Sequence, residues 1–294
     1  MTHTPADPGT ESWSELPAAS AAQAMDWSLV LLSQGIECVI VHAPEGWRLR
    51  VPAASLSTAQ TVLARYEAEN RPRPWQRELY GTGLIFDWAS VAWALVAIAF
   101  FLLADRFPLL RERGFLDGAA VWEGQWWRLL TAIWLHADAA HLAMNLSFGI
   151  PLLALAMGGY GSGCGFLAAL LAGILGNAAA LAVAGPAHRS LGASGMVLGA
   201  LGLLTALGVW WSRRVHVRPR WAVAALAAGL MLFVLLGAAP ESDLLAHGGG
   251  FGAGLLLGGV LVPHLTRTRS GALNLLAGWI AATLTILAWY LALR

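Results

Sequence analysis

Two side chains of complementary chemistry lie near the starts of two separate apolar stretches of this chain. Ser194 lies in Gly192-Ala193-Ser194-Gly195 at the start of one stretch, and His247 lies near the start of another, two stretches later. A serine hydroxyl is a weak nucleophile until a base takes its proton, and imidazole can be that base because it titrates near neutral pH. Polar side chains inside a membrane are costly and usually functional. These residues therefore predict peptide-bond hydrolysis within a bilayer.

The composition is that of a multi-pass membrane protein. Of the 294 residues, 57% are hydrophobic and only 12% are charged, and the mean hydropathy is +0.62. A net charge of +1 argues against a nucleic-acid partner. The two cysteines, Cys38 and Cys164, fit no metal-ligand spacing. The expected surroundings are membrane lipids.

Apolar segments of roughly twenty residues, the length that a helix needs to cross a bilayer, dominate the chain from residue 87 onwards. The seven segments are 87–104, 139–159, 164–184, 192–211, 221–239, 244–262 and 272–292. The sequence therefore predicts an all-α membrane fold, with a six-helix core over 87–262 and a seventh membrane-spanning helix within 263–294. Four tryptophans in the connection 105–138 suit a membrane interface.

The amino-terminal region differs in composition from the rest of the chain. Residues 1–25 are predicted to be a disordered tail, because Thr, Pro, Ser, Glu and Ala dominate them. Residues 26–70 predict a small soluble α+β module with the order helix, strand, strand and helix. Residues 71–86 predict a linker.

The placement of arginine predicts the orientation of the spans. The loops after the fourth and sixth spans carry arginines without acidic residues, whereas the loop between the fifth and sixth spans carries only Glu241 and Asp243. The arginines are Arg213, Arg214, Arg218, Arg220, Arg267 and Arg269. By the positive-inside rule these basic loops are cytoplasmic. The amino-terminal module is then cytoplasmic and the carboxyl end lies outside, as expected in a bacterial inner membrane.

Spans two, four and six run in the same direction, so the polar residues at their starts should meet near the outer face. His141 and Asn145 open span two, four residues apart on one helix face. Both can donate hydrogen bonds to the oxyanion of a tetrahedral intermediate, as can the N–H of Ser194 at a helix start. The structural alternative is that both only bridge neighbouring helices. No carboxylate suits a triad, so the sequence predicts a serine–histidine dyad, and no metal site.

Two pairs of glycines lie on the spans that carry the dyad. Gly195 and Gly199 lie on span four, and Gly250 and Gly254 follow His247 on span six. Small residues four apart let membrane helices approach closely, which the dyad requires. The alternative is that glycine is simply common in membrane helices.

Together these motifs resemble the rhomboid family of intramembrane serine proteases, over roughly residues 87–262. The matching residues are Trp127, Arg128, His136, His141, Asn145, the motif Gly192 to Gly195, Ala246, His247, Gly250 and Gly254. The resemblance implies a nucleophile at Ser194, a general base at His247, and an oxyanion hole of His141, Asn145 and the Ser194 N–H. It also implies that Trp127, Arg128 and His136 support the outer loop.

The resemblance further implies cleavage of transmembrane helices of other membrane proteins near their outer ends, with small residues before the scissile bond and without a metal or nucleotide cofactor. One residue departs from the family pattern: Leu198 stands where many relatives carry a tyrosine that packs on the histidine. We therefore expect a less restrained His247. His188 and Arg189 are expected in a solvated loop. The alternatives are a catalytically weak or inactive rhomboid-fold protein that binds membrane clients, and a transporter. The natural substrate and oligomeric state are left open.

Overall fold

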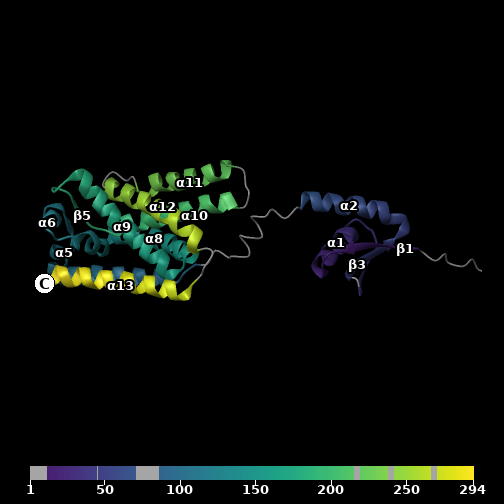
Figure 1. The fold of residues 1–294 in the computed structure, drawn as a ribbon, viewed down its shortest axis with the longest axis horizontal. Coiled ribbons are helices and arrows are strands. Elements are labelled where there is room, and N and C mark those ends of the chain that lie inside the picture. The colour runs from purple at the N-terminus through teal and green to yellow at the C-terminus, as the bar shows by residue number, and fades with distance from the viewer. Residues whose placement is uncertain (1–11, 45, 71–85, 215–218, 238–241, 266–269) are drawn as a thin grey trace, which may run out of the picture. The chain divides into compact units, whose positions relative to one another are not determined.

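The computed structural model describes residues 12–44, 46–70, 86–214, 219–237, 242–265 and 270–294 (Figure 1). The chain divides into two compact units, Met1–Arg77 and Glu78–Arg294. Within the described residues of the second unit, seven helices are long and apolar enough to cross a membrane. They are α4 (Ala89–Arg106), α8 (Ala139–Tyr160), α9 (Ser162–Ala184), α10 (Ser194–Arg214), α11 (Arg220–Gly237), α12 (Leu244–Leu265) and α13 (Gly271–Leu293). The predicted all-α multi-pass membrane fold is confirmed.

The amino-terminal unit is a three-stranded antiparallel sheet with two helices on one face. Its elements are β1 (Trp13–Ala18), α1 (Ala21–Ser33), β2 (Val39–Ala43), β3 (Gly46–Pro52), the 3-10 turn η1 (Ala53–Ser55) and α2 (Leu56–Glu69), with strand order β1-β3-β2. Leu49 and Val51 of β3 are fully buried under the helices. Arg48 and Arg50 alternate with them and donate to Glu15 of β1 at 2.7 and 2.9 Å. This alternation is the usual pattern of a half-buried strand.

The prediction of a disordered tail up to residue 25 is wrong from Trp13 onwards. Residues Trp13–Ala18 form β1, whose Leu16 is buried opposite Leu49 of β3. Helix α1 begins at Ala21, within the predicted tail, because the Ser20 side chain accepts the Gln23 N–H as an N-cap. The prediction rested on composition alone, and composition does not reveal a short strand with one buried leucine. Most of the predicted linker, residues 71–85, lies outside the described residues.

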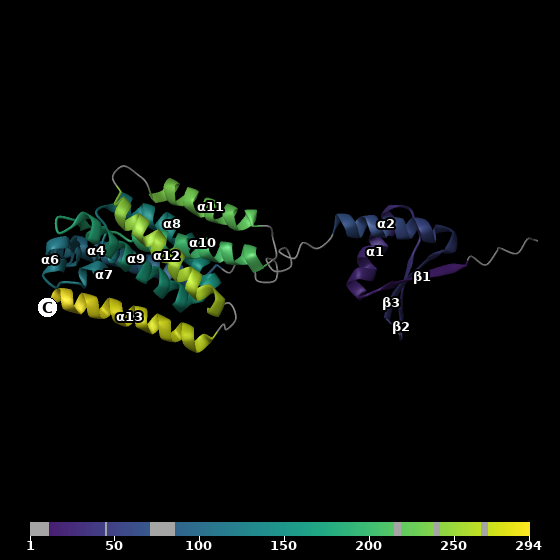
Figure 2. The ribbon, with the colours of Figure 1, turned by 45° about the horizontal axis from the view of Figure 1, so that its top comes forward.

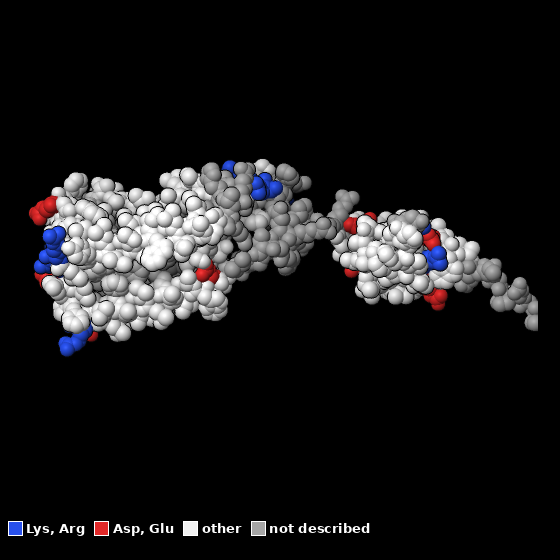
Figure 3. Space-filling model, turned by 60° about the horizontal axis from the view of Figure 1, so that its bottom comes forward, with Lys and Arg blue, Asp and Glu red and all other residues white. Residues whose placement is uncertain are grey.

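The helical unit has the surface expected of a chain that spans a bilayer. Figure 3 shows a broad uncharged band on this unit, with its arginines and acidic residues gathered toward the two ends. Helices α11 and α13 lie on opposite sides of the unit in both ribbon views (Figure 1, Figure 2). Between them lies α10, the most buried of the seven spans. A charge within the band would be costly in hydrocarbon, so this pattern fits lipid contact over the face that Figure 3 shows.

Glycines bring α10 and α12 into backbone contact. A Cβ added at Gly250 would lie 2.2 Å from the Gly195 carbonyl oxygen, and one added at Gly254 would lie 2.0 Å from the Gly199 carbonyl oxygen. No larger residue fits either position, because the obstructing atoms belong to the neighbouring backbone. The glycines are therefore required for packing here, as small residues are in many membrane helix pairs.

The connection between α4 and α8 is folded, which the sequence did not predict. It contains α5 (Pro108–Gly114), β4 (Leu116–Asp117), α6 (Gly118–Trp122), α7 (Arg128–Thr131) and the 3-10 turn η2 (Ala132–Trp134). Strand β4 pairs with β5 (Arg189–Ser190), in the loop between α9 and α10. The connection and this loop therefore form one framework at one end of the spans.

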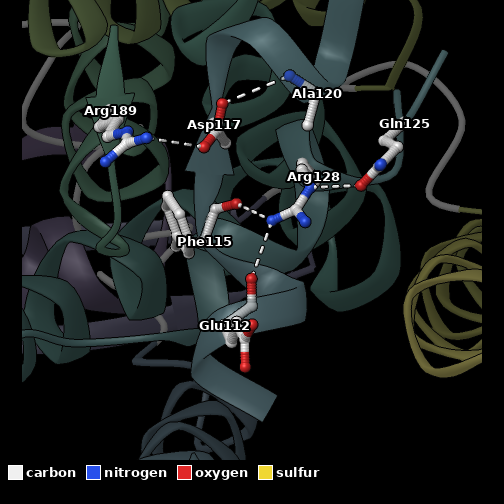
Figure 4. Close-up of polar contacts among 7 residues, drawn as sticks. All are labelled: Glu112, Phe115, Asp117, Ala120, Gln125, Arg128 and Arg189. Atoms are coloured by element: carbon white, nitrogen blue, oxygen red, sulfur yellow. Dashed lines mark hydrogen bonds and ion pairs between the residues drawn. The ribbon is translucent and has the colours of Figure 1, made fainter. Parts of the chain in front are cut away.

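Arg128 holds this framework together from inside. Only 8% exposed, it donates from Nη1 to the carbonyl oxygens of Glu112 and Phe115 at 3.1 and 2.8 Å, and from Nε to Gln125 at 2.8 Å (Figure 4). Nearby, Asp117 caps α6 through the Ala120 N–H and lies 3.4 Å from Arg189. A buried guanidinium needs several such acceptors, because leaving its N–H groups unpaired would be costly.

We predict that Gly254→Ala destabilises the helical unit by about 2 kcal/mol, because overpacking forces α10 and α12 apart. The measurement is the midpoint of thermal unfolding in detergent. The matched control is Gly252→Ala on the same helix, where an added Cβ meets nothing within 4 Å. Equal midpoints for the two variants would contradict the packing account.

We predict that Arg128→Lys destabilises the protein by about 2 kcal/mol, because an ammonium group cannot reach all three acceptors at once. The thermal midpoint again reports the effect. Arg106→Lys is the control, because the exposed Arg106 only lies over the Phe107 ring, 5.9 Å from its centre. An unchanged midpoint in Arg128→Lys would show that the buried contacts add nothing.

Candidate active site

Ser194 and His247 face each other within hydrogen-bond distance. Ser194 is the first residue of α10, and His247 lies in the first turn of α12. The Ser194 Oγ and His247 Nε2 atoms are 2.7 Å apart. Ser194 is half-buried and His247 is only 6% exposed. The geometry is that of a hydroxyl whose proton can pass directly to an imidazole.

The tautomer of His247 follows from its second contact. Its Nδ1 lies 2.7 Å from the carbonyl oxygen of Gly237, at the end of α11. A carbonyl oxygen can only accept, so Nδ1 carries the ring hydrogen and Nε2 keeps its lone pair. The lone pair therefore faces the Ser194 hydroxyl, which donates to it. A backbone carbonyl here orients the ring as a carboxylate does in a serine triad. No sequence signal predicts this contact, because any residue at position 237 would supply a carbonyl.

His141 and Asn145 of α8 face the same cavity as the two dyad residues. The cavity has a volume of about 730 Å³ and is also lined by Leu198, Leu236 and Phe148. The structure thus brings these four polar residues to one cavity. The cavity walls are largely apolar, which strengthens any hydrogen bond made inside.

Gly192 allows His141 to come close to the nucleophile. Its φ of +134° lies in the region that favours glycine. An added Cβ would lie 2.8 Å from His141 Nε2 and 3.8 Å from Ser194 Oγ. The His141 ring thus lies directly against the turn that leads into α10, in reach of the space beside Ser194.

Asn145 is buried beside His141, but its side chain bonds its own helix. Its Nδ2 donates to the His141 carbonyl oxygen at 3.0 Å. One amide hydrogen is used in this way, and an amide nitrogen carries two. Among the described residues, the Asn145 side chain makes no hydrogen bond to a neighbouring helix. The structural alternative, in which Asn145 only bridges helices, would need such a bond.

His136 lies behind His141 and away from the cavity. Its side chain is 1% exposed, and its ring centre is 5.3 Å from that of His141 in an edge-on arrangement. Burial lowers the pKa of His136 to about 4, so the ring is neutral at physiological pH. Arg111 donates to its backbone carbonyl at 2.8 Å. His136, with Trp127 and Arg128, belongs to the framework that surrounds the site.

The loop before Ser194 contacts the connection between α4 and α8 at three points. The Gly118 N–H donates to the His188 carbonyl at 2.9 Å, β5 pairs with β4, and the Gly192 N–H donates to the Ala132 carbonyl at 2.9 Å. The His188 side chain was expected in solvent but is only 12% exposed, and its Nε2 lies 3.0 Å from Asp243 Oδ2. Arg189 is exposed, as expected.

Comparisons with known proteins bear on this same stretch. The profile of the rhomboid domain matches residues 123–264. RHOMBOID-like protein 5 of Arabidopsis thaliana is 34% identical over 179 residues, which cover 59% of this chain and 55% of that protein. Rhomboid protease GluP of Bacillus subtilis (strain 168) is 39% identical over 120 residues, which cover 38% of this chain and 22% of that protein.

RHOMBOID-like protein 4 of Arabidopsis thaliana is 33% identical over 179 residues, which cover 55% of this chain and 42% of that protein. The chain thus spans about half the length of the first of these relatives, and less of the others. The matched stretch 123–264 contains every polar residue that faces the cavity from α8, α10 and α12. Residues 123–264 thus carry a rhomboid domain, and the chain is similar along this stretch to proteins of the rhomboid family.

Proposed function

We propose that this chain is an intramembrane serine endopeptidase that hydrolyses peptide bonds of other transmembrane proteins through Ser194 and His247. The observation that carries the proposal is the arrangement of Ser194 Oγ, the His247 ring and the Gly237 carbonyl in one line of hydrogen bonds of 2.7 Å each. The arrangement orients an unprotonated imidazole nitrogen at a serine hydroxyl inside an apolar cavity. One relative is named a rhomboid protease, which supports the proposal.

The reaction begins when the Ser194 hydroxyl gives its proton to His247 Nε2. The Ser194 oxygen then forms a bond to the carbonyl carbon of the substrate, and a tetrahedral intermediate results. His247 returns the proton to the leaving amine nitrogen as the peptide bond breaks, which leaves an acyl group on Ser194. Water attacks this ester with His247 again as base, and Ser194 regains its proton when the acid product leaves.

The oxyanion of each intermediate is stabilised by donors on α8 and α10. We assign this role to the Ser194 N–H, the His141 ring and the free amide hydrogen of Asn145. The Ser194 N–H is at a helix start, where backbone N–H groups have no partner within the helix. Donors fixed in advance in an apolar cavity stabilise developing charge more than mobile water does.

The substrates are transmembrane helices that unwind at the site, because an intact helix hides its carbonyl groups in its own hydrogen bonds. Helix-breaking residues in the substrate should therefore help, and a small residue is expected before the scissile bond. With the basic loops in the cytoplasm, the site lies near the outer face of a bacterial inner membrane. The amino-terminal unit is then cytoplasmic and the carboxyl end lies outside.

We predict that Ser194→Ala and His247→Ala each lower cleavage of a single-span substrate in liposomes by at least about 10³-fold. The midpoints of thermal unfolding should stay close to that of the wild type. The substitutions remove only the hydrogen bond between Ser194 and His247 and, in His247→Ala, the contact with the Gly237 carbonyl. Ser212→Ala on the same helix and His42→Ala in the amino-terminal unit are controls, and both should cleave normally. Normal cleavage by Ser194→Ala would refute the proposed function.

We predict that a membrane-impermeant maleimide labels Glu123→Cys, but not Ser57→Cys, in intact cells of a variant whose two native cysteines are replaced by alanine. Both positions are exposed, Glu123 in the outer connection and Ser57 on α2. Permeabilised cells should label both. The opposite labelling pattern in intact cells would reverse the proposed orientation.

A further inference from the structure

Asp243 makes a set of contacts that the chemistry of the dyad leaves unexplained. It stands directly before α12, and its Oδ1 accepts the Ala246 N–H at 3.0 Å, as an N-cap does. Its backbone carbonyl accepts the His247 N–H at 2.9 Å. Asp243 therefore sets both the start of α12 and the position of the backbone that bears His247.

The other carboxylate oxygen of Asp243 faces the loop that leads to Ser194. Asp243 Oδ2 lies 3.0 Å from His188 Nε2, and both atoms are closed to solvent. The two atoms approach without the alignment of a hydrogen bond, so the contact is electrostatic. Neither atom has a hydrogen-bond partner in the described part of the chain.

The charged and titratable side chains near His188 and Asp243 have other partners. The Arg189 guanidinium lies 3.4 Å from the Asp117 carboxylate of β4. The His247 ring is held between Ser194 and the Gly237 carbonyl, so Asp243 does not bond it. Asp138 caps α8 by accepting the His141 N–H at 2.8 Å. His188 Nε2 is thus the group that meets Asp243 Oδ2.

From these contacts we propose that Asp243 and His188 form a link that positions His247 against Ser194. The proposal rests on the proposed function and assigns two positioning residues to it. The loop bearing His188 is already fastened to the outer framework through the Gly118 N–H, β4 and the Ala132 carbonyl. The Asp243 contact extends this framework to α12, which carries the base. The link therefore fixes the separation of the two reacting side chains at the outer ends of α10 and α12.

The glycine contacts between α10 and α12 do not make this link redundant. They clamp the helices from Gly195 and Gly250 inwards, one turn or more below Asp243. The segment just outside the clamp is where helix ends fray, because the first N–H groups lack partners within the helix. The contact of Asp243 with His188 limits the motion of the first turn of α12, which carries His247. Small displacements of a catalytic base strongly reduce the rate.

The experiment separates the cap from the charge. Asp243→Asn keeps an oxygen that can cap α12 and removes the charge, whereas Asp243→Ala removes both. His188→Asn removes the partner. We expect Asp243→Asn and His188→Asn each to lower kcat about fivefold with unchanged KM, as expected for loss of one charge contact. The double variant should be no slower than either single variant, and Asp243→Ala should be slower than Asp243→Asn.

Asp105→Asn is the matched control, because it removes an exposed aspartate near the end of α4 and should leave kcat unchanged. Hydrogen–deuterium exchange over residues 244–247 reads the link without any substrate, and both single variants should exchange faster there. Wild-type kcat in the single variants with unchanged exchange, or a double variant slowed by the product of the single effects, would overturn the link. An inactive wild type would refute the proposed function instead, while the exchange measurement would still decide the link.

Discussion

The backbone contact between α10 and α12 is the constraint on which the rest of the site depends. Ser194 and His247 lie on different spans, and their 2.7 Å contact exists only because glycines let two helix backbones touch beneath them. In a bilayer no hydrophobic driving force pushes helices together, so close packing has to supply the association. The dyad is thus a consequence of packing one turn below it, and any residue larger than glycine at Gly250 would separate the reacting atoms.

Much of this arrangement could be predicted from the sequence, because the relevant signals are local. Apolar runs of span length predicted seven helices, and the parity of the spans brought His141, Ser194 and His247 to one end. The glycine spacing predicted the contact of α10 with α12. These inferences hold because a bilayer fixes helix length and direction, which leaves few ways to arrange the chain.

What the sequence did not reveal depends on backbone atoms and on contacts between distant segments. The orientation of His247 comes from the Gly237 carbonyl, which any residue could supply. The contact of His188 with Asp243 joins two loops, and no spacing rule relates them. Strand β1 was missed because only Leu16 of its six residues is buried. Leu198, which stands where many relatives carry a tyrosine, lines the cavity that Ser194 and His247 face.

If His247 activates Ser194 as proposed, Ser194 should react with a serine-directed fluorophosphonate probe. Intact-mass analysis and peptide mapping of the labelled protein in detergent would locate the adduct and count it. We expect one adduct per chain, on Ser194, and its loss in a folded His247→Ala variant. An adduct elsewhere, or labelling of Ser194 that is as fast in His247→Ala as in the wild type, would contradict it.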